Sequence, residues 1–126
     1  MEELNIMESN NIVIANHTHT HPLLKNCTEL DINTEVKLAI TWLKNNEFSG
    51  SEIFAYPNGG WSKVVESKLI ENNIQLAFLF DHELNKNKID PFKVSRLSVN
   101  SDTELQKFKF ILSGVHSLTL SIFRKR

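Results

Sequence analysis

Short apolar runs alternate along the chain with segments of helical spacing, and this alternation constrains the fold more than any other feature. The apolar runs are rich in β-branched or aromatic residues and are bounded by polar or glycine-containing turns, which is typical of buried strands. Strands that alternate with helices favour parallel βαβ units. The sequence therefore predicts an α/β fold with about four strands, too few to close a barrel by themselves. The three main runs are residues 12–15, 52–56 and 74–80.

The segments between and after these runs predict helices and one further strand. A helix is expected to start after Asn33 or Thr34, since either side chain can cap it. Another helix is expected over residues 62–71. Residues 97–99 predict a brief strand, and Asp102 is expected to cap a last helix.

The composition excludes several classes of function. A chain of 126 residues, 40% hydrophobic and 23% charged, fits one globular domain, which we take as residues 1–126. The net charge of −1 offers no basic field that would favour nucleic acid or an anionic membrane as a partner. No apolar run approaches the roughly 20 residues that a membrane span requires. The acidic N-terminus does not resemble a signal peptide, so the chain as written is expected in the cytoplasm.

Three histidines within five residues follow the first predicted strand. Loops at the carboxyl ends of parallel strands usually carry the chemistry of α/β enzymes. His17 and His21 are four residues apart, so in a helical turn both can reach one ion, whereas His19 points elsewhere. Imidazole is a good zinc ligand, but a catalytic zinc normally has three protein ligands and a water. At this point an exposed loop of alternating His and Thr, with no ligand, explains the segment equally well.

The sequence around these histidines resembles a known motif. Ile14-Ala-Asn-His-Thr-His-Thr-His-Pro-Leu23 is similar to the second motif of the polysaccharide deacetylases, the NodB-homology domains of carbohydrate esterase family four. That motif is His-Ser/Thr-x-x-His, usually preceded by Gly-Asn or a close variant and followed by Pro. The resemblance implies that His17 and His21 are the metal ligands, that Thr18 supports the loop and that His19 occupies a free position.

A second segment supports the same resemblance. Phe54-Ala-Tyr-Pro-Asn-Gly-Gly-Trp61 is similar to the family's third motif, often Phe-Arg-x-Pro-Tyr-Gly or Phe-Ala-Tyr-Pro-Tyr-Gly. This loop lines the substrate groove in the family, which implies groove positions for Tyr56, Pro57 and Trp61. The amide after the proline is expected to help hold the oxyanion, and here it belongs to Asn58, where the family usually has an aromatic residue. A backbone N–H survives that change, and losing such a donor can cost about 10²–10³ in rate.

A third segment matches less closely. Asp90-Pro-Phe-Lys-Val-Ser-Arg-Leu-Ser-Val99 resembles the Asp-Pro-x-x-Leu-Pro-Arg-Ile segment common in bacterial members. By this match Arg96 corresponds to the arginine expected to orient a catalytic carboxylate, although a surface arginine beside a strand explains this segment alone equally well. His82, after the third predicted strand, is a further position for an active-site histidine. The three segments follow the order and spacing of the family.

The family's first motif, Thr-Phe-Asp-Asp-Gly, has no counterpart in the chain. In the family it supplies the base aspartate and the aspartate that completes the metal site. It should lie well before the histidine motif, and only sixteen residues precede His17. The late motif that supplies an acid histidine in many members is also absent. The resemblance therefore implies an incomplete (β/α) barrel of the NodB-homology type whose N-terminal strands are missing.

The activity that the resemblance implies is metal-dependent hydrolysis of N-acetyl groups on amino-sugar polymers. The implied cofactor is Zn²⁺ or another divalent metal, held weakly without the missing aspartate, and the implied partner is an N-acetylated amino-sugar polymer. Three hypotheses follow: an N-deacetylase completed by an N-terminal partner fragment, a truncated remnant that is inactive alone, or a non-catalytic carbohydrate- or metal-binding module. Full-length relatives are often exported or held at the cell surface.

Overall fold

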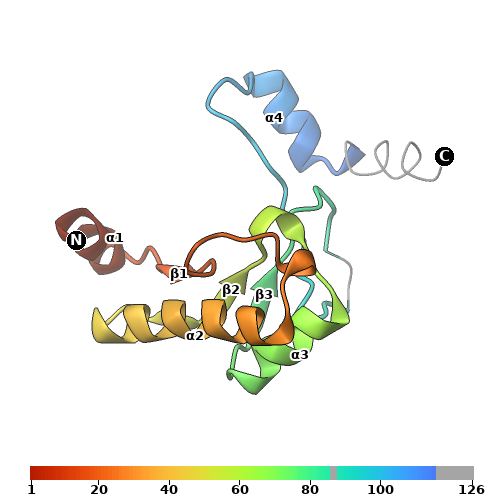
Figure 1. The fold of residues 1–126 in the computed structure, drawn as a ribbon. Coiled ribbons are helices and arrows are strands. Elements are labelled where there is room, and N and C mark those ends of the chain that lie inside the picture. Colours follow the sequence, from red (N-terminus) through yellow and green to blue (C-terminus); the bar gives the residue numbers. More distant parts are fainter. Residues whose placement is uncertain (86–87, 116–126) are drawn as a thin grey trace.

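A small parallel sheet forms the centre of the protein (Figure 1). The structure is a computed structural model that describes residues 1–85 and 88–115. Within this part of the chain the strand order is β1-β2-β3, and both pairs are parallel. The strands are β1 (Ala15–Asn16), β2 (Gly50–Ala55) and β3 (Leu76–Phe78). The α/β prediction is therefore confirmed; the reading as an incomplete barrel stays a prediction.

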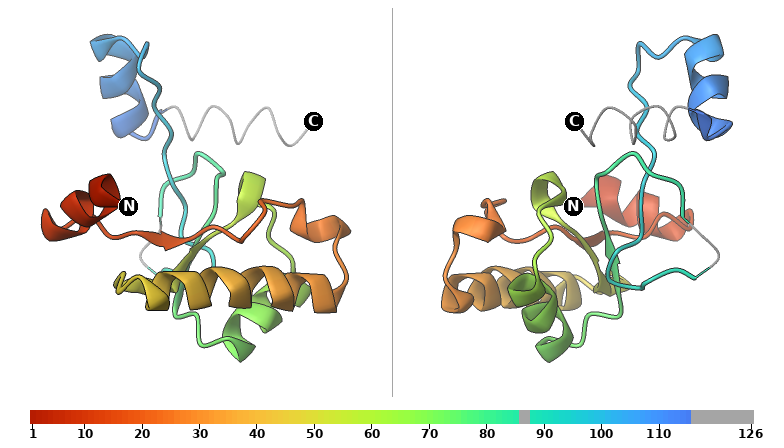
Figure 2. Two further views of the ribbon diagram at one scale, coloured as in Figure 1. Left: turned by 60° about the vertical axis from the view of Figure 1, so that its left-hand side comes forward. Right: turned by 90° about the vertical axis from the view of Figure 1, so that its right-hand side faces the viewer.

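Two helices connect the strands and cover one face of the sheet (Figure 2). Phe54 and Tyr56 alternate with outward residues along β2, and both are buried against these helices. Val36 and Leu69 face them from the helix side and are also buried, so the core lies between the sheet and the helix layer. The connecting helices are α2 (Glu29–Asn45) and α3 (Lys63–Glu71), and two short 3₁₀ turns are η1 (Leu24–Asn26) and η2 (Pro57–Gly59).

The opposite face of the sheet has no helix layer among the described residues. Ile53, Ala55 and Phe78 point to this face and stay partly exposed. Together with Val13 and Arg96 they line a hollow of about 330 Å³. The sheet is thus packed on one side and open on the other, the opposite of the two-sided burial that parallel sheets usually show.

Two terminal helices flank this centre. In α1 (Glu2–Ser9) the Glu8 carboxylate accepts hydrogen bonds from the backbone N–H groups of Ser49, at 2.8 Å, and Ile14, at 3.1 Å. The helix α4 (Leu105–Leu112) stands away from the sheet (Figure 1), and Ile111 is its one buried residue. Its N-cap is Glu104, so the predicted cap at Asp102 is wrong by two positions.

The long helix α2 begins earlier than the sequence indicated. Thr28, and neither Asn33 nor Thr34, is its N-cap. The Thr28 hydroxyl accepts a hydrogen bond from the Asp31 N–H while the Asp31 carboxylate accepts one from the Thr28 N–H, which is a capping box. This reciprocal pair satisfies two orphan donors at once, so it outcompetes a single later cap.

The predicted strand at 97–99 is also wrong. The segment that adds to the sheet lies earlier, where Val94 forms a parallel bridge to Phe78. The Val94 N–H donates to the Ala77 carbonyl, and the Leu79 N–H donates to the Val94 carbonyl. Just before this bridge the Pro91 carbonyl accepts a hydrogen bond from the Ala77 N–H.

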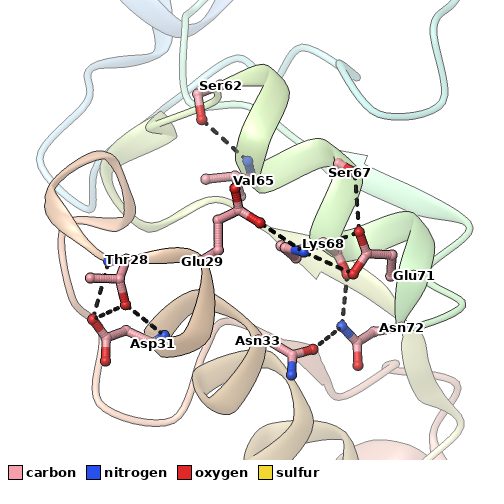
Figure 3. A network of polar contacts seen from close by, with 10 residues as sticks. All are labelled: Thr28, Glu29, Asp31, Asn33, Ser62, Val65, Ser67, Lys68, Glu71 and Asn72. Atoms are coloured by element: carbon pink, nitrogen blue, oxygen red, sulfur yellow. Dashed lines mark hydrogen bonds and ion pairs between the residues drawn. The ribbon is translucent and has the colours of Figure 1, made fainter.

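A polar network joins α2 to α3 on the surface (Figure 3). The Lys68 ammonium lies 3.0 Å from the Glu29 carboxylate of α2 and 3.0 Å from the Glu71 carboxylate of its own helix. Asn72 donates to the Asn33 side chain at 2.9 Å. Exposed ion pairs contribute little, so burial of the apolar core remains the main force that holds the two helices together.

None of the helices in the described ranges combines the length and apolar character that crossing a bilayer requires.

Replacing Thr28 by alanine is expected to lower the free energy of unfolding by about 1 kcal/mol, because the Asp31 N–H loses the hydroxyl that accepts its hydrogen bond, while the Thr28 backbone N–H keeps the Asp31 carboxylate. Thr34→Ala is the matched control: Thr34 lies inside the helix, where its hydroxyl donates to the Leu30 carbonyl, and the change should stay within about 0.5 kcal/mol. Urea unfolding of both variants measures this. A larger loss for Thr34→Ala than for Thr28→Ala would place the helix start where the sequence first suggested.

Candidate metal and substrate site

The histidine loop leaves β1 through a bulge. Ala15 pairs with Gly50 and Asn16 with Phe54, so the register shifts between two consecutive residues of β1. Bulges bend a strand, redirect the next side chains and are common beside active sites. The bulge therefore turns the chain away from the sheet at His17.

Asn16 anchors this turn from inside the protein. Its side chain is 1% exposed, the one buried polar residue reported among those described. The amide nitrogen donates to the Val36 carbonyl of α2 at 3.2 Å, and the amide oxygen accepts from the Thr18 N–H at 2.9 Å. Both ends of the amide are satisfied, as a buried polar group requires. Asn16 thus fixes the start of the loop relative to α2.

Glu35 of α2 holds the far side of the loop. One carboxylate oxygen accepts from the N–H groups of His19, at 2.9 Å, and Thr20, at 2.7 Å, and the other accepts from the Thr20 hydroxyl at 2.7 Å. Burial raises the pKa of Glu35, but the hydrogen bonds from Thr20 and His19 together outweigh it, so the pKa lies below its ordinary value. The charged carboxylate is therefore part of the loop's structure.

The loop brings His17 and His21 together, as the sequence predicted. Their ring centroids are 4.8 Å apart with an interplanar angle of 64°. The His17 Nδ1 lies 2.7 Å from the Ala55 carbonyl of β2, an acceptor that requires the proton on Nδ1. The Nε2 atom of that tautomer carries a free lone pair, which is the arrangement in which a histidine binds a metal. Thr18 supports the loop, because its hydroxyl accepts from the His21 N–H at 3.1 Å.

Backbone strain gathers at the same place. Thr18 has φ 69° and His21 has φ 58°, and both Asn58 (φ 52°) and His82 (φ 60°) follow neighbouring strands. Asparagine tolerates this left-handed region, but a β-branched threonine rarely adopts it. Such residues persist only where the surrounding contacts impose them, and they concentrate at functional sites.

A cavity of about 290 Å³ opens between these loops. His17 and His21 form one wall, and Asn58 and Arg96 lie at its other sides. The structure therefore assembles the two predicted ligands, the predicted oxyanion donor and the predicted arginine around one hollow. Its full lining is His17, His21, Tyr56, Asn58, Phe80 and Arg96.

Asn58 and Arg96 each offer donors to this hollow. Asn58 is exposed, and no hydrogen bond of the described residues uses its backbone N–H as a donor. Arg96 donates from Nε to the Leu79 carbonyl at 2.7 Å, and its guanidinium carbon is 6.0 Å from the Phe80 ring centroid. Among the ion pairs of the described residues Arg96 has no carboxylate partner.

The residues predicted to line the substrate groove differ in exposure. Tyr56 borders the cavity, but its side chain is fully buried and its hydroxyl donates to the Phe92 carbonyl at 3.1 Å. Pro57 is also buried, so both support the loop from beneath and cannot contact a ligand with their side chains. Trp61 is partly exposed; its indole N–H donates to the Glu66 carboxylate at 2.6 Å, and the Lys93 ammonium lies 4.5 Å from its ring.

The donor set fits part of a metal site. Two histidines face each other, and one is held in the tautomer that leaves a lone pair. The described residues contain no group of three His, Cys, Asp or Glu side chains that could hold a metal ion. A catalytic zinc normally has three protein ligands. A zinc site at these two histidines would therefore need at least one ligand from outside the described residues.

Three groups that shape the candidate site were not predicted from the sequence: the Glu35 carboxylate, the buried Asn16 amide and the Phe80 ring. Glu35 and Asn16 act through contacts with segments distant in sequence, so no local pattern predicts these contacts. Phe80 was counted as the last residue of the predicted strand 74–80, but β3 ends at Phe78 and Phe80 is exposed, which no sequence signal indicated.

The comparisons with known proteins agree with this geometry. The polysaccharide deacetylase family model matches residues 1–77 of the 126. The chain belongs to the polysaccharide deacetylase family. Among solved structures, the deacetylase PplD of Streptococcus pyogenes, in complex with acetate, is similar with a TM-score of 0.68 and 17% sequence identity. The match covers 79% of this chain and 43% of the PplD chain, and at this identity it shows the fold alone. No curated protein matches the sequence.

Replacing Glu35 by glutamine is expected to lower the free energy of unfolding by about 1 kcal/mol at neutral pH, because the loop's N–H groups lose a charged acceptor that is partly screened by solvent. The pKa of Glu35 is lowered by folding, so this stabilisation is complete above its ordinary value of 4.5 and is lost as pH falls through the lowered value. Wild type and variant should therefore converge in acid.

Urea unfolding at neutral pH and in acid measures this, and amide exchange at His19 and Thr20 should accelerate in the variant. Glu47→Gln is the control, since it removes the same charge from an exposed position after α2. A difference between Glu35→Gln and wild type that does not shrink in acid would contradict the assigned role.

Proposed function

We propose that this chain carries one part of a metal-dependent polysaccharide N-deacetylase site, which hydrolyses acetamide groups on amino-sugar polymers. The observation that supports the proposal most is the meeting of three features at one hollow. The paired imidazoles of His17 and His21 face the same cavity as the unpartnered backbone N–H of Asn58. Membership of the polysaccharide deacetylase family supports deacetylation as the reaction that this arrangement would serve.

His17 and His21 would hold the metal, Zn²⁺ or another divalent ion. The bond from the His17 Nδ1–H to the Ala55 carbonyl holds the ring in place and makes its other nitrogen a better ligand. When bound, such a metal polarises a carbonyl group and lowers the pKa of a water molecule. The hydrogen bonds to Glu35 and Asn16 hold the backbone that carries the two rings, which supports a shared role for them.

Besides the metal, the proposed reaction needs hydrogen-bond donors for the developing negative charge and a base. In the overall reaction water adds to the acetamide carbon and the C–N bond breaks, which gives acetate and a free amine. The Asn58 N–H is suited to donate to the oxygen on which negative charge develops, a contribution that can be worth about 10²–10³ in rate. Arg96 is suited to orient a carboxylate that acts as base, because its guanidinium lines the hollow.

That carboxylate, and the third metal ligand, would come from outside the described residues. In the described part of the chain β1 pairs with β2 alone, so its other edge can accept a further strand. The hollow of about 330 Å³ on the open face, lined in part by Val13 and Ile53, offers the apolar surface that further strands of a barrel would cover once the sheet curves round to face it. An N-terminal partner fragment that completes an unfinished (β/α) barrel is the source we propose.

A second candidate is a non-catalytic carbohydrate- or metal-binding module. The lack of a three-ligand group within the described residues favours it for the chain taken alone. Weak zinc binding without turnover would be its signature.

Zinc titration tests the ligand assignment. Calorimetry of the full 126-residue chain should show weak binding that falls at least about tenfold in His17→Ala and in His21→Ala, since each removes one of two ligands. His19→Ala is the matched control from the same loop; it should change the affinity by no more than about twofold, because only the backbone N–H of His19 holds the loop. An unchanged affinity after replacement of both His17 and His21 would remove the site.

Acetate release tests the need for an outside carboxylate. The 126-residue chain alone, with zinc and oligomers of N-acetylglucosamine, is expected to release no measurable acetate, because its described residues contain no group of three side chains that could hold the metal. A fluorescent or enzymatic acetate assay at high protein concentration measures this. Steady, zinc-dependent acetate release from the purified chain would show that it holds a complete site.

A further inference from the structure

Phe80 is an exposed aromatic side chain inside the polar cavity. It lies just after β3 and is 48% exposed, although a phenylalanine normally gains by burial. It borders the same hollow as His17 and His21. One wall of the cavity is therefore a flat apolar ring, and the other walls carry ring nitrogens, a backbone N–H and a guanidinium.

The position of Phe80 relative to the reacting groups is fixed by the backbone. Gly59 has φ 68°, and a Cβ at that residue would lie 3.0 Å from the Phe80 N atom and 3.1 Å from its carbonyl oxygen. The loop that carries Asn58 is thus packed directly on the end of β3. The distance between the Asn58 N–H and the Phe80 residue is set by two backbone segments in contact, and no long flexible side chain intervenes.

Neighbouring side chains flank the ring as well. The His82 ring lies 4.9 Å from it, centroid to centroid, with an interplanar angle of 56°. The Arg96 guanidinium carbon lies 6.0 Å from its centroid. Phe80 therefore has neighbours at its backbone, beside its ring and over its ring, yet it stays 48% exposed and lines the cavity.

We propose that Phe80 is the platform on which a pyranose ring of the substrate lies, and that it makes the site prefer acetylated sugars over small acetamides. The proposal rests on the deacetylase function proposed above. A pyranose carries axial C–H groups on its faces, and these pack on an aromatic ring, while its equatorial hydroxyl and acetamide groups point sideways. A sugar placed on Phe80 extends its acetamide across the hollow toward Asn58 and the two histidines.

The test measures how tightly N-acetylglucosamine trimer binds to the full chain in zinc-containing buffer. Saturation-transfer NMR detects the binding, and NMR titration gives the affinity. The wild type should bind the trimer, and Phe80→Ala should weaken binding at least about fivefold through loss of stacking area. Phe80→Leu keeps apolar volume without a flat ring and should lose nearly as much, whereas Phe80→Trp should keep wild-type affinity within about threefold. Acetamide, the small probe, should bind all variants equally.

Phe110→Ala is the matched control, because Phe110 is a similarly exposed phenylalanine, 42% exposed, on α4 away from the cavity lining. Unfolding midpoints of all variants confirm that they fold. Trimer binding that is unchanged in both Phe80→Ala and Phe80→Leu, or absent in the wild type, overturns the inference.

The zinc titration keeps the two proposals separate. Loss of trimer binding in the Phe80 variants with unchanged zinc affinity supports the platform. If the wild type binds no zinc but binds the trimer in a Phe80-dependent way, the platform stands and the metal-dependent function falls. If zinc binds through His17 and His21 but trimer binding ignores Phe80, the platform falls and the metal site stands.

Discussion

The buried amide of Asn16 is the interaction on which the candidate site depends. It sits at the bulge that ends β1 and ties α2, through the Val36 carbonyl, to the first turn of the histidine loop, through the Thr18 N–H. A buried amide left with an unmatched partner would cost about 1–3 kcal/mol, so both bonds are strongly enforced. Thr18 adopts a positive φ that a threonine rarely takes, so the surrounding contacts impose the turn. The spacing of His17 and His21 is therefore a consequence of packing between β1 and α2, and the metal does not have to impose it.

The site is preorganised but not closed, and the reason is the single helix layer. The two helices cover one face of the sheet (Figure 2). The cavity is lined by residues of the loops that follow the strands. Both histidines are exposed, so the electrostatic interactions of this hollow are screened by water. Catalysis in this family's chemistry gains most from donors in a water-excluded site. The structure thus separates two requirements: geometry is supplied by the described residues, whereas exclusion of water needs further protein or substrate.

The sequence predicted the alternation of strands and helices and the meeting of His17 and His21, because each depends on local patterns. Apolar runs marked the three strands, and a spacing of four residues marked His17 and His21. The start of α2 was missed because Thr28 and Asp31 cap it reciprocally, and a later threonine carries the same local signal. The added strand was misplaced because the bridge at Val94 is decided by its partner Phe78, far away in sequence. The role of Glu35 could not be predicted for the same reason, since it arises only when α2 packs beside the histidine loop.

The arrangement of the cavity follows from the parallel sheet itself. Parallel strands deliver the residues after their carboxyl ends to one edge, so His17 follows β1, Asn58 follows β2 and Phe80 follows β3. Order along the chain thereby becomes order across the strand ends: the proposed metal ligands come first, the proposed oxyanion donor second and the Phe80 ring third. The Gly59 contact with Phe80 locks the last two together. A ligand that contacts all three must reach across three strand ends, which is why the proposal above favours a sugar unit with its acetamide over a bare acetamide.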